Sequence, residues 1–227
     1  MPVPWELFER EASRYEAWYA GSRGRRVDQA ERELLKWLLG CFPDARSVLE
    51  VGCGTGHFAA WLVERAMRVV GLDRAPAMLG EMRRHSPKIP AILGDAHSLP
   101  FCDGAVDLVM FVTTLEFLED HAKALAEAVR VARQGIILVV LNRWSVGGFS
   151  RRWGPQACQP LLGRARDYSV WTLRAAVEKA AGERMERIRW ASTLFPARLW
   201  RFRGRLPFGE VIGMAAALCP LGHCTCE

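Results

Sequence analysis

The sequence predicts an α/β protein with a doubly wound, mostly parallel sheet and helices on both of its faces. Between residues 47 and 141, apolar runs of five to seven residues alternate with segments of helical periodicity. Several of these runs end in an acid or a glycine, where the carboxyl edge of such a sheet holds its ligand. One run leads directly into Gly52, Gly54 and Gly56. Glycines in this position suit a turn that needs positive φ or close approach of the backbone to a ligand.

The N-terminal 40 residues read as a helical lead to the sheet. Helices are expected over 5–20 and 28–40, with a break at the segment Gly21-Ser22-Arg23-Gly24. The second helix is predicted by four leucines at helical spacing between 34 and 39.

The sheet and its crossovers follow in order. Strands are expected over 47–51, 68–72, 89–93, 106–112 and 136–141, and helices over 57–65, 76–85 and 120–133. Pro76 supports the start of the second of these helices, because proline suits the first turn. The strands are short, apolar and joined by helices, which predicts parallel pairing.

The regular alternation of strands and helices is interrupted between the fifth strand and the next helix. Residues 143–168 contain two adjacent glycines and two prolines, and a connection this long in a compact domain is typical of a functional segment. We expect it to form a cap over a substrate. A helix over 169–181, capped by Ser169, and strands over 187–192 and 208–218 complete the chain. Residues 219–227 are expected to be a mobile tail that contains cysteines.

Composition supports one domain over residues 1–227. Half of the residues are hydrophobic and a quarter are charged, as is ordinary for a globular protein. The N-terminus has neither a basic start nor an apolar run, and the longest uncharged apolar run, 211–222, is too short to cross a bilayer. Seven cysteines without framework spacing favour a reducing compartment. We therefore expect a cytoplasmic protein with no transmembrane segment.

The positive charge is concentrated in the last third of the chain. The net charge is +6, and residues 151–227 hold 13 Lys and Arg against 6 Asp and Glu. The segment Arg184–Arg205 contains seven of these arginines, interleaved with aromatic residues. It could form a groove for RNA or a patch for anionic lipid, although a solvated basic face over core aromatics is the favoured interpretation.

Polar or charged residues lie at or close to the carboxyl ends of four predicted strands. Glu50 lies in the first strand, Asp73 ends the second, Asp95 follows the third, and Thr113 follows the fourth. Asp73 stands 17 residues after Gly56, where an acid can accept hydrogen bonds from both ribose hydroxyls. The glycine spacing is G-x-G-x-G, which differs from the G-x-G-x-x-G of dinucleotide phosphate loops.

These motifs resemble those of class I S-adenosylmethionine-dependent methyltransferases, in the small-molecule branch that includes the ubiquinone and menaquinone biosynthesis enzymes. The matching segments are V-L-E-V-G-C-G-T-G-H-F (48–58), G-L-D-R-A-P-A-M-L (71–79), G-D-A-H-S-L-P-F (94–101) and A-V-D-L-V-M-F-V-T-T-L-E-F-L (105–118). The lead from Tyr15 to Glu31 resembles the segment that closes over the cofactor in this branch. The resemblance extends over residues 15–142 and weakens beyond them.

The resemblance implies a cofactor, S-adenosylmethionine with S-adenosylhomocysteine as product, and a seven-stranded Rossmann-like sheet whose last strand is antiparallel. Residues 1–40 would be a helical lid. Glu50 would hold the ammonium through water, Asp73 the ribose hydroxyls, and Asp95 the adenine amino group. The full set of implied cofactor-binding residues is Glu50, Gly52, Cys53, Gly54, Gly56, Asp73, Arg74, Met78, Asp95, Ala96 and Thr113.

No catalytic base is assigned. Methyl transfer is an in-line displacement in which alignment can supply about 7–11 kcal/mol, and a base is needed only if the nucleophile arrives protonated. His121, Glu116 and Tyr15 are weak candidates, for which capping, solvated or core roles compete.

The expected function is methyl transfer to a small or lipophilic acceptor. An RNA methyltransferase or RNA-binding protein that uses residues 184–205 is the alternative, and a non-catalytic S-adenosylmethionine-binding protein is the second. A bound metal is not expected; weak candidate ligands are Cys219, His223, Cys224 and Cys226, which lack paired zinc spacing. The oligomeric state is not indicated by the sequence.

Overall fold

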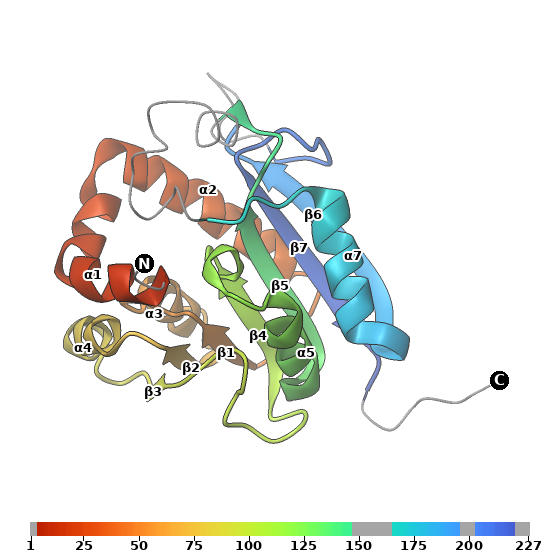
Figure 1. Cartoon of the computed structure of the whole chain (residues 1–227), viewed down its shortest axis with the longest axis horizontal. Helices are drawn as coiled ribbons and strands as arrows, with labels where there is room; N and C mark the ends of the chain where they lie inside the picture. The colour runs from red at the N-terminus through yellow and green to blue at the C-terminus, as the bar shows by residue number, and fades with distance from the viewer. Residues whose placement is uncertain (1–3, 147–164, 196–202, 221–227) are drawn as a thin grey trace.

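The computed structural model describes residues 4–146, 165–195 and 203–220, and it contains one seven-stranded sheet (Figure 1). The strand order is β3-β2-β1-β4-β5-β7-β6. The strands are β1 (Ser47–Val51), β2 (Arg68–Asp73), β3 (Ala91–Leu93), β4 (Val106–Val112), β5 (Ala132–Leu141), β6 (Met185–Thr193) and β7 (Val211–Leu218). β7 lies antiparallel between β5 and β6, whereas β1 to β5 pair in parallel. The predicted fold class is confirmed, including the antiparallel last strand.

Helices cover both faces of the sheet (Figure 1). They are α1 (Pro4–Ala20), α2 (Ser22–Leu39), α3 (His57–Val63), α4 (Pro76–His85), α5 (His121–Val131) and α7 (Val170–Ala181), with short 3₁₀ turns η1 (Leu115–Phe117) and η4 (Gly182–Arg184). The core on one face is built with α5 and α7, and the core on the other face with α2, α3 and α4. α1 packs on α4 and α2 and extends over the carboxyl edge of the sheet.

The two central strands are apolar because they are buried on both sides. Every residue of β1 and of β4 is buried, which is the pattern of a parallel strand between two helical layers. The edges differ from the centre. β3 has only three residues, and β6 places exposed arginines at 187 and 189 along its length. A short strand and a charged strand both discourage pairing with another chain.

Several predicted boundaries were wrong. The break in the N-terminal lead is confined to Gly21, and α2 begins at Ser22 instead of residue 28. Gly24 therefore lies inside the helix. A Cβ at Gly24 would approach the carbonyl oxygen of Trp18 to 2.0 Å, so the residue serves the close corner between α1 and α2. α5 ends at Val131, two residues early, because β5 already begins at Ala132. β3 begins at Ala91 and β7 at Val211, later than predicted.

Asp107 fastens the amino ends of β1, β4 and β5 together, at the edge of the sheet away from the glycine turn. Its Oδ2 accepts hydrogen bonds from the backbone of Arg46 and Ser47, both at 2.9 Å, and from the Ser47 hydroxyl at 2.8 Å. Its Oδ1 accepts from Arg133 at 2.8 Å. Burial alone would raise the pKa of this carboxyl, but the donors lower it well below its ordinary value.

The substitution Asp107→Asn is expected to lower the free energy of unfolding at pH 7 by about 2–3 kcal/mol, because the amide leaves charged and neutral donors poorly satisfied. Since the folded pKa is depressed, the stabilisation is present above the unfolded pKa of about 3.9 and is lost as pH falls through the folded value. Urea denaturation at pH 7 and at pH 3 measures the difference between the wild type and the variant, which shrinks at the lower pH.

Asp103→Asn is the matched control. Asp103 also pairs with an arginine, Arg130, but its side chain is 65% exposed. Its loss is expected to change the free energy of unfolding by less than about 1 kcal/mol. Equal effects of the two substitutions would contradict the role given to Asp107.

Candidate functional site

A cavity opens at the carboxyl ends of β1, β2 and β4, beneath α1. It encloses about 760 Å³ of empty space, including its open mouth, which is within the usual range for small-molecule sites. Its lining comprises Trp5, Phe8, Tyr15, Val51, Gly52, Gly54, Leu72, Asp73, Arg74, Met78, Gly94, Asp95, Ala96, His97, Val112, Thr113, Thr114, Phe117, Leu118 and Glu119. The cavity thus joins the strand ends to the N-terminal helix and to the turn after β4.

The glycine turn after β1 forms the floor of this cavity. Gly52, Gly54 and Gly56 all have positive φ, of 71°, 54° and 83°. A Cβ at Gly52 would lie 2.2 Å from Cγ2 of Thr114, and one at Gly56 would lie 2.6 Å from Cγ of Met82. At Gly54 the nearest atom would be 3.9 Å away. Gly52 and Gly56 are therefore required by packing as well as by conformation, whereas Gly54 leaves open space in the cavity.

Asp73 connects the end of β2 to the glycine turn. Its Oδ2 accepts the Gly54 N–H and its Oδ1 accepts the Ala75 N–H, both at 2.8 Å. Burial raises the pKa of this carboxyl above its ordinary value, although both hydrogen bonds oppose the shift. The backbone of Arg74 also donates toward this carboxylate, which still keeps acceptor capacity for a hydroxyl donor of a bound ribose.

Glu50 lies within β1 and is only 2% exposed. Its Oε2 is buried and accepts no hydrogen bond from the described residues. Burial, with the nearby charge of Asp73 second, raises its pKa to about 8. A buried carboxyl oxygen without a partner is costly, and an ammonium group or a bridging water near it would relieve that cost. Glu50 lies outside the cavity lining but directly precedes Val51, which lines it, so its orphaned oxygen fits a ligand whose amino group is reached through a bridging water.

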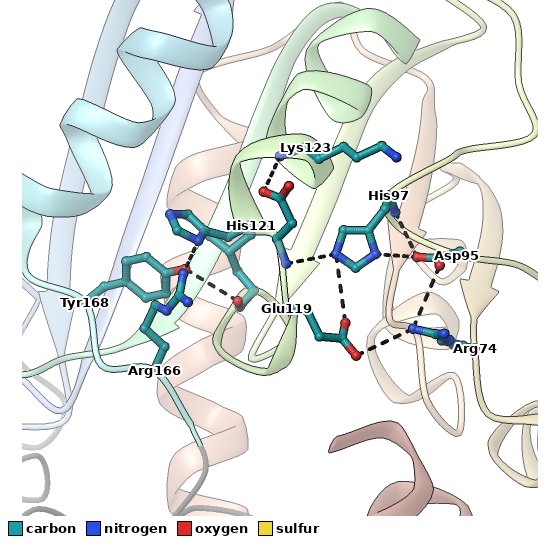
Figure 2. A network of polar contacts seen from close by, with 10 residues as sticks. Arg74, Asp95, His97, Glu119, His121, Lys123, Arg166 and Tyr168 are labelled. Carbon is teal, nitrogen blue, oxygen red and sulfur yellow. Dashed lines mark hydrogen bonds and ion pairs between the residues drawn. The ribbon is translucent and has the colours of Figure 1, made fainter. Parts of the chain in front are cut away.

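A polar network that includes four lining residues, Arg74, Asp95, His97 and Glu119, lies at the side of the cavity near β3, and Figure 2 shows its contacts. Oδ1 of Asp95 lies 2.6 Å from Nδ1 of His97 and accepts the His97 backbone N–H at 2.9 Å. Arg74 lies 3.8 Å from Asp95 and 3.7 Å from Glu119. Partial burial would raise the pKa of Asp95, but the hydrogen bonds of His97 and the charge of Arg74 lower it on balance. Asp95 is thus an ionised acceptor at the mouth of the cavity.

Helix α1 supplies an aromatic roof. Phe8 meets Phe117 edge to face at 4.9 Å between ring centroids, and Arg74 lies 5.5 Å from the ring of Trp5. The helix is tied down by Glu9, whose carboxylate accepts the Ala77 N–H at the start of α4 at 2.9 Å. Helix α1, which forms the roof, is therefore held by η1 through Phe117 and by α4 through Ala77.

The three candidate bases occupy different positions. Tyr15 lines the cavity, but burial raises its pKa to about 12, so its hydroxyl stays protonated at neutral pH. Glu116 is buried in η1, where its Oε1 accepts the Leu141 N–H at 2.6 Å. His121 begins α5 outside the cavity lining, and its ring contacts Arg166 (Figure 2). Partial burial and the charge of Arg166 lower the pKa of His121.

Thr113 has an unusual backbone conformation for a non-glycine residue. Its φ is 49°, and its N–H donates to the carbonyl of Val139 at 2.8 Å. Such strain persists only where the surrounding structure enforces it, and it is frequent at functional sites. Here it turns the chain at the end of β4 toward the cavity.

Eight of the eleven implied cofactor residues line the cavity: Gly52, Gly54, Asp73, Arg74, Met78, Asp95, Ala96 and Thr113. Glu50, Cys53 and Gly56 lie outside its lining. Cys53 is buried against Met82, with 3.6 Å between the two sulfur atoms. Burial raises the pKa of its thiol well above the ordinary value, so a packing role explains this residue.

Several lining residues were not predicted. Trp5 and Phe8 could have been found from the spacing of 5, 8, 12 and 15, which places one apolar face of α1 toward the cavity. Thr114, Phe117, Leu118 and Glu119 come from the turn after β4, where no periodicity indicates which side chains face a ligand.

The basic segment is partly engaged in the fold. The Arg184 guanidinium donates to backbone carbonyl groups of Val129, Ala132 and Cys219. Arg203 and Arg205 lie 5.4 and 5.7 Å from the ring centres of Trp37 and Trp190. The remaining part, 196–202, lies outside the described residues.

The predictions about metal ligands and about the cap concern residues that are only partly described by the structure. Within the described residues no three His, Cys, Asp or Glu side chains gather as metal ligands, and the tail from 221 onward, with His223, Cys224 and Cys226, lies outside them. So do residues 147–164 of the expected cap. In the part of the chain that the structure describes, no helix combines the length and apolarity needed to cross a bilayer.

Comparison with known proteins identifies the class. Residues 49–140 match the family described as "Methyltransferase domain". A malonyl-[acyl-carrier protein] O-methyltransferase of Serratia marcescens is 35% identical over 132 residues, which cover 58% of this chain and 49% of that protein. A demethylmenaquinone methyltransferase of Renibacterium salmoninarum is 38% identical over 109 residues, which cover 48% of this chain and 46% of that protein. The chain thus spans about half the length of these curated relatives.

A solved structure extends the similarity to nearly the whole chain. The crystal structure of an S-adenosylmethionine-dependent methyltransferase from Thermotoga maritima, titled a "possible histamine N-methyltransferase", is 26% identical. The TM-score is 0.78, with 94% of this chain and 99% of that chain covered. The family match shows a methyltransferase domain at residues 49–140, and the fold and these relatives, which are those of Rossmann-like, S-adenosylmethionine-dependent methyltransferases, imply S-adenosylmethionine as its cofactor.

The glycine turn provides a test of the site's construction. Gly54→Ala is expected to cost about 1–2 kcal/mol of unfolding free energy, which is the cost of a left-handed alanine. Gly52→Ala is expected to cost about 2–5 kcal/mol, because it adds an overlap with Thr114. Urea denaturation measures both.

Thr114→Ala serves as the second arm of a double-mutant cycle. It is expected to recover part of the loss in Gly52→Ala and none of the loss in Gly54→Ala. Additive effects at positions 52 and 114 would show that the predicted overlap does not set the conformation of the turn.

Proposed function

We propose that this chain catalyses transfer of a methyl group from S-adenosylmethionine to a small or lipophilic acceptor. The observation that carries the proposal is the cavity itself, in which the implied cofactor residues on the strand ends adjoin an aromatic roof from α1 and η1. When bound, the cofactor supplies a methyl group activated by its sulfonium. The acceptor's lone pair would form the new bond to the methyl carbon as the carbon–sulfur bond broke, which would leave S-adenosylhomocysteine.

The chain's own residues position the two reactants. In this proposal Asp73 holds the ribose hydroxyls, Asp95 and the Ala96 backbone hold the adenine, and Glu50 faces the ammonium through water. The Gly54 backbone lets the cofactor approach the floor without a side chain between them. Alignment and exclusion of water are then the main contributions of the protein.

The roof and the cap complete this proposal. We assign residues 1–40 as a lid, because α1 contributes Trp5, Phe8 and Tyr15 to the cavity. We keep residues 143–168 as the cap on the acceptor side, as the sequence predicts. The single-domain organisation and a cytoplasmic location remain predictions.

The lining favours a small acceptor over RNA. Its charged side chains include the acids Asp73, Asp95 and Glu119 but only one arginine, Arg74. Because Asp73 and Asp95 are assigned to the cofactor, an acceptor would meet chiefly Glu119 and the aromatic rings of the roof, which suit an apolar or planar molecule better than a polyanion. The names of the relatives mention different acceptors, malonyl-[acyl-carrier protein] and demethylmenaquinone, so similarity alone does not select the acceptor.

The acceptor is expected to react without a base from the three candidates. Among the described residues, Tyr15 is the candidate that lines the cavity, and its raised pKa keeps it protonated. We therefore propose an acceptor that is acidic enough to ionise by itself or that needs no deprotonation before attack.

A panel of phenols, quinols, thiols and amines, assayed with methyl-labelled S-adenosylmethionine, tests the proposal. Label is expected to appear in at least one small acceptor and not in RNA. If S-adenosylmethionine binds but no acceptor is labelled, the result favours a non-catalytic S-adenosylmethionine-binding protein. Labelled RNA would favour an RNA methyltransferase.

Once an acceptor is known, Tyr15→Phe tests the assignment of roles. The substitution keeps the aromatic ring in the roof and removes only the hydroxyl. It is expected to change kcat by less than about threefold, since general base catalysis would contribute about 10²–10⁴-fold. A loss of a hundredfold or more would make Tyr15 a catalytic residue.

A further inference from the structure

His57 occupies the junction between the glycine turn and the two N-terminal helices. It is the first residue of α3 and directly follows Gly56. Its Nε2 lies 2.7 Å from Oδ1 of Asp28 in α2, and its Nδ1 lies 3.7 Å from Oε2 of Glu16 in α1. The imidazole is therefore flanked by one carboxylate on each nitrogen side.

Aromatic stacking holds the same ring in place. The ring of Tyr19 in α1 stacks on the imidazole with 3.8 Å between centroids and 9° between planes. Only 15% of the His57 side chain is exposed. In this orientation the His57 ring stacks on Tyr19 and lies near the Glu16 carboxylate, both in α1. It also makes a short contact with the Asp28 carboxylate in α2.

The α1 side of this junction leads directly into the cavity. Glu16 follows Tyr15, which lines the cavity, and its carboxylate also accepts a hydrogen bond from the Thr55 hydroxyl in the glycine turn. The junction therefore fixes the roof of the cavity to its floor, outside the cavity itself.

We propose that His57 is a positioning residue whose protonated ring, paired with Glu16 and Asp28, holds α1 closed over the cofactor. The imidazolium donates through Nε2 to Asp28 and presents its Nδ1–H to Glu16. The neutral ring loses one of these donors and the attraction to both carboxylates, so α1 is released more readily and the cofactor leaves faster. This inference depends on cofactor binding and is independent of the acceptor.

One neighbouring charge opposes protonation of the ring, and two favour it. Arg32 of α2 lies 3.1 Å from Nε2 and by itself disfavours the imidazolium, but its guanidinium is also bound to Asp28 at 2.7 Å. Tyr19, the remaining titratable group against the ring, has a pKa raised well above its ordinary value by burial and stays neutral. Burial by itself lowers the pKa of His57, but Glu16 and Asp28 raise it on balance. Pairing with His57 lowers the pKa of Glu16, to which His85 contributes at longer range.

The contact between His57 and the two carboxylates is expected to depend on pH. Since the folded pKa of His57 is raised, the closed contact is fully present below the ordinary pKa of about 6.5 and is lost as pH rises through the folded value. The contribution of His57 to cofactor affinity is therefore expected to fall above neutral pH.

Isothermal titration with S-adenosylhomocysteine between pH 6 and pH 9 tests the proposal. Glu50, whose pKa is raised to about 8, also titrates in this range, so the prediction concerns the difference in Kd between the wild type and the His57 variants. His57→Arg keeps a cation that can stack on Tyr19, and it is expected to bind tightly with a weaker dependence on pH. His57→Gln is expected to bind about fivefold more weakly at pH 6 and to approach the wild type at pH 9.

Hydrogen exchange of the α1 amides, corrected for intrinsic rates, provides a readout of closure itself. Protection is expected to be lower in His57→Gln than in His57→Arg at pH 6. Glu16→Gln retains the Thr55 contact and is expected to reduce the pH dependence while preserving the fold. His121→Gln is the control, because His121 lies outside the cavity lining and its ring contacts Arg166; it is expected to retain the wild-type pH profile.

Two results would overturn the proposal. If His57→Arg bound as weakly as His57→Gln, the charge of the residue would not matter. If the wild type and His57→Gln showed the same change of Kd with pH, the titration would belong to groups within the cavity, which all variants retain.

Discussion

The hydrogen bond from the Gly54 N–H to the Asp73 carboxylate is the contact on which the site depends. At 2.8 Å it fixes the glycine turn after β1 to the end of β2, and these are the two strand ends that form the cavity floor. The turn can reach Asp73 only because its three glycines adopt positive φ, which a side chain would oppose. Asp73 thereby serves the fold through one set of lone pairs and retains another set for a ligand.

The second requirement is a roof, and the chain builds it from its own beginning. α1 crosses the carboxyl edge of the sheet (Figure 1) and is fastened at both ends of the cavity, by Glu9 on α4 and by Glu16 on the glycine turn. These contacts are polar and peripheral, whereas the sheet is held by two continuous apolar cores. Because less apolar surface fastens the roof than the sheet, we infer that α1 opens at a lower free energy than the strands separate. If α1 is the proposed lid, its opening would admit the cofactor without unfolding the floor.

Much of the fold could be predicted because its signals are local. Buried strands such as Val106–Val112 are apolar throughout, and the alternation of strands and helices predicts parallel pairing. The boundary errors have physical reasons. Glycine at position 24 predicts a break between two helices, yet close packing against Trp18 requires a glycine inside helix α2. The strand ends also indicated most of the cavity floor, since parallel strands bring their carboxyl ends together. The roof and the His57 junction were not predictable in this way, because they depend on how α1 and α2 cross the sheet.

Binding of S-adenosylhomocysteine to the wild type and to Asp73→Asn tests most directly whether Asp73 holds the cofactor. We expect saturable one-to-one binding by the wild type in isothermal titration calorimetry. We expect at least about tenfold weaker binding by the variant, because the amide is a poorer acceptor for the ribose hydroxyls while it also holds the turn. Thermal melts of the two proteins without ligand separate loss of binding from loss of fold. Absence of binding to the wild type, or binding of NADH in its place, would contradict the account.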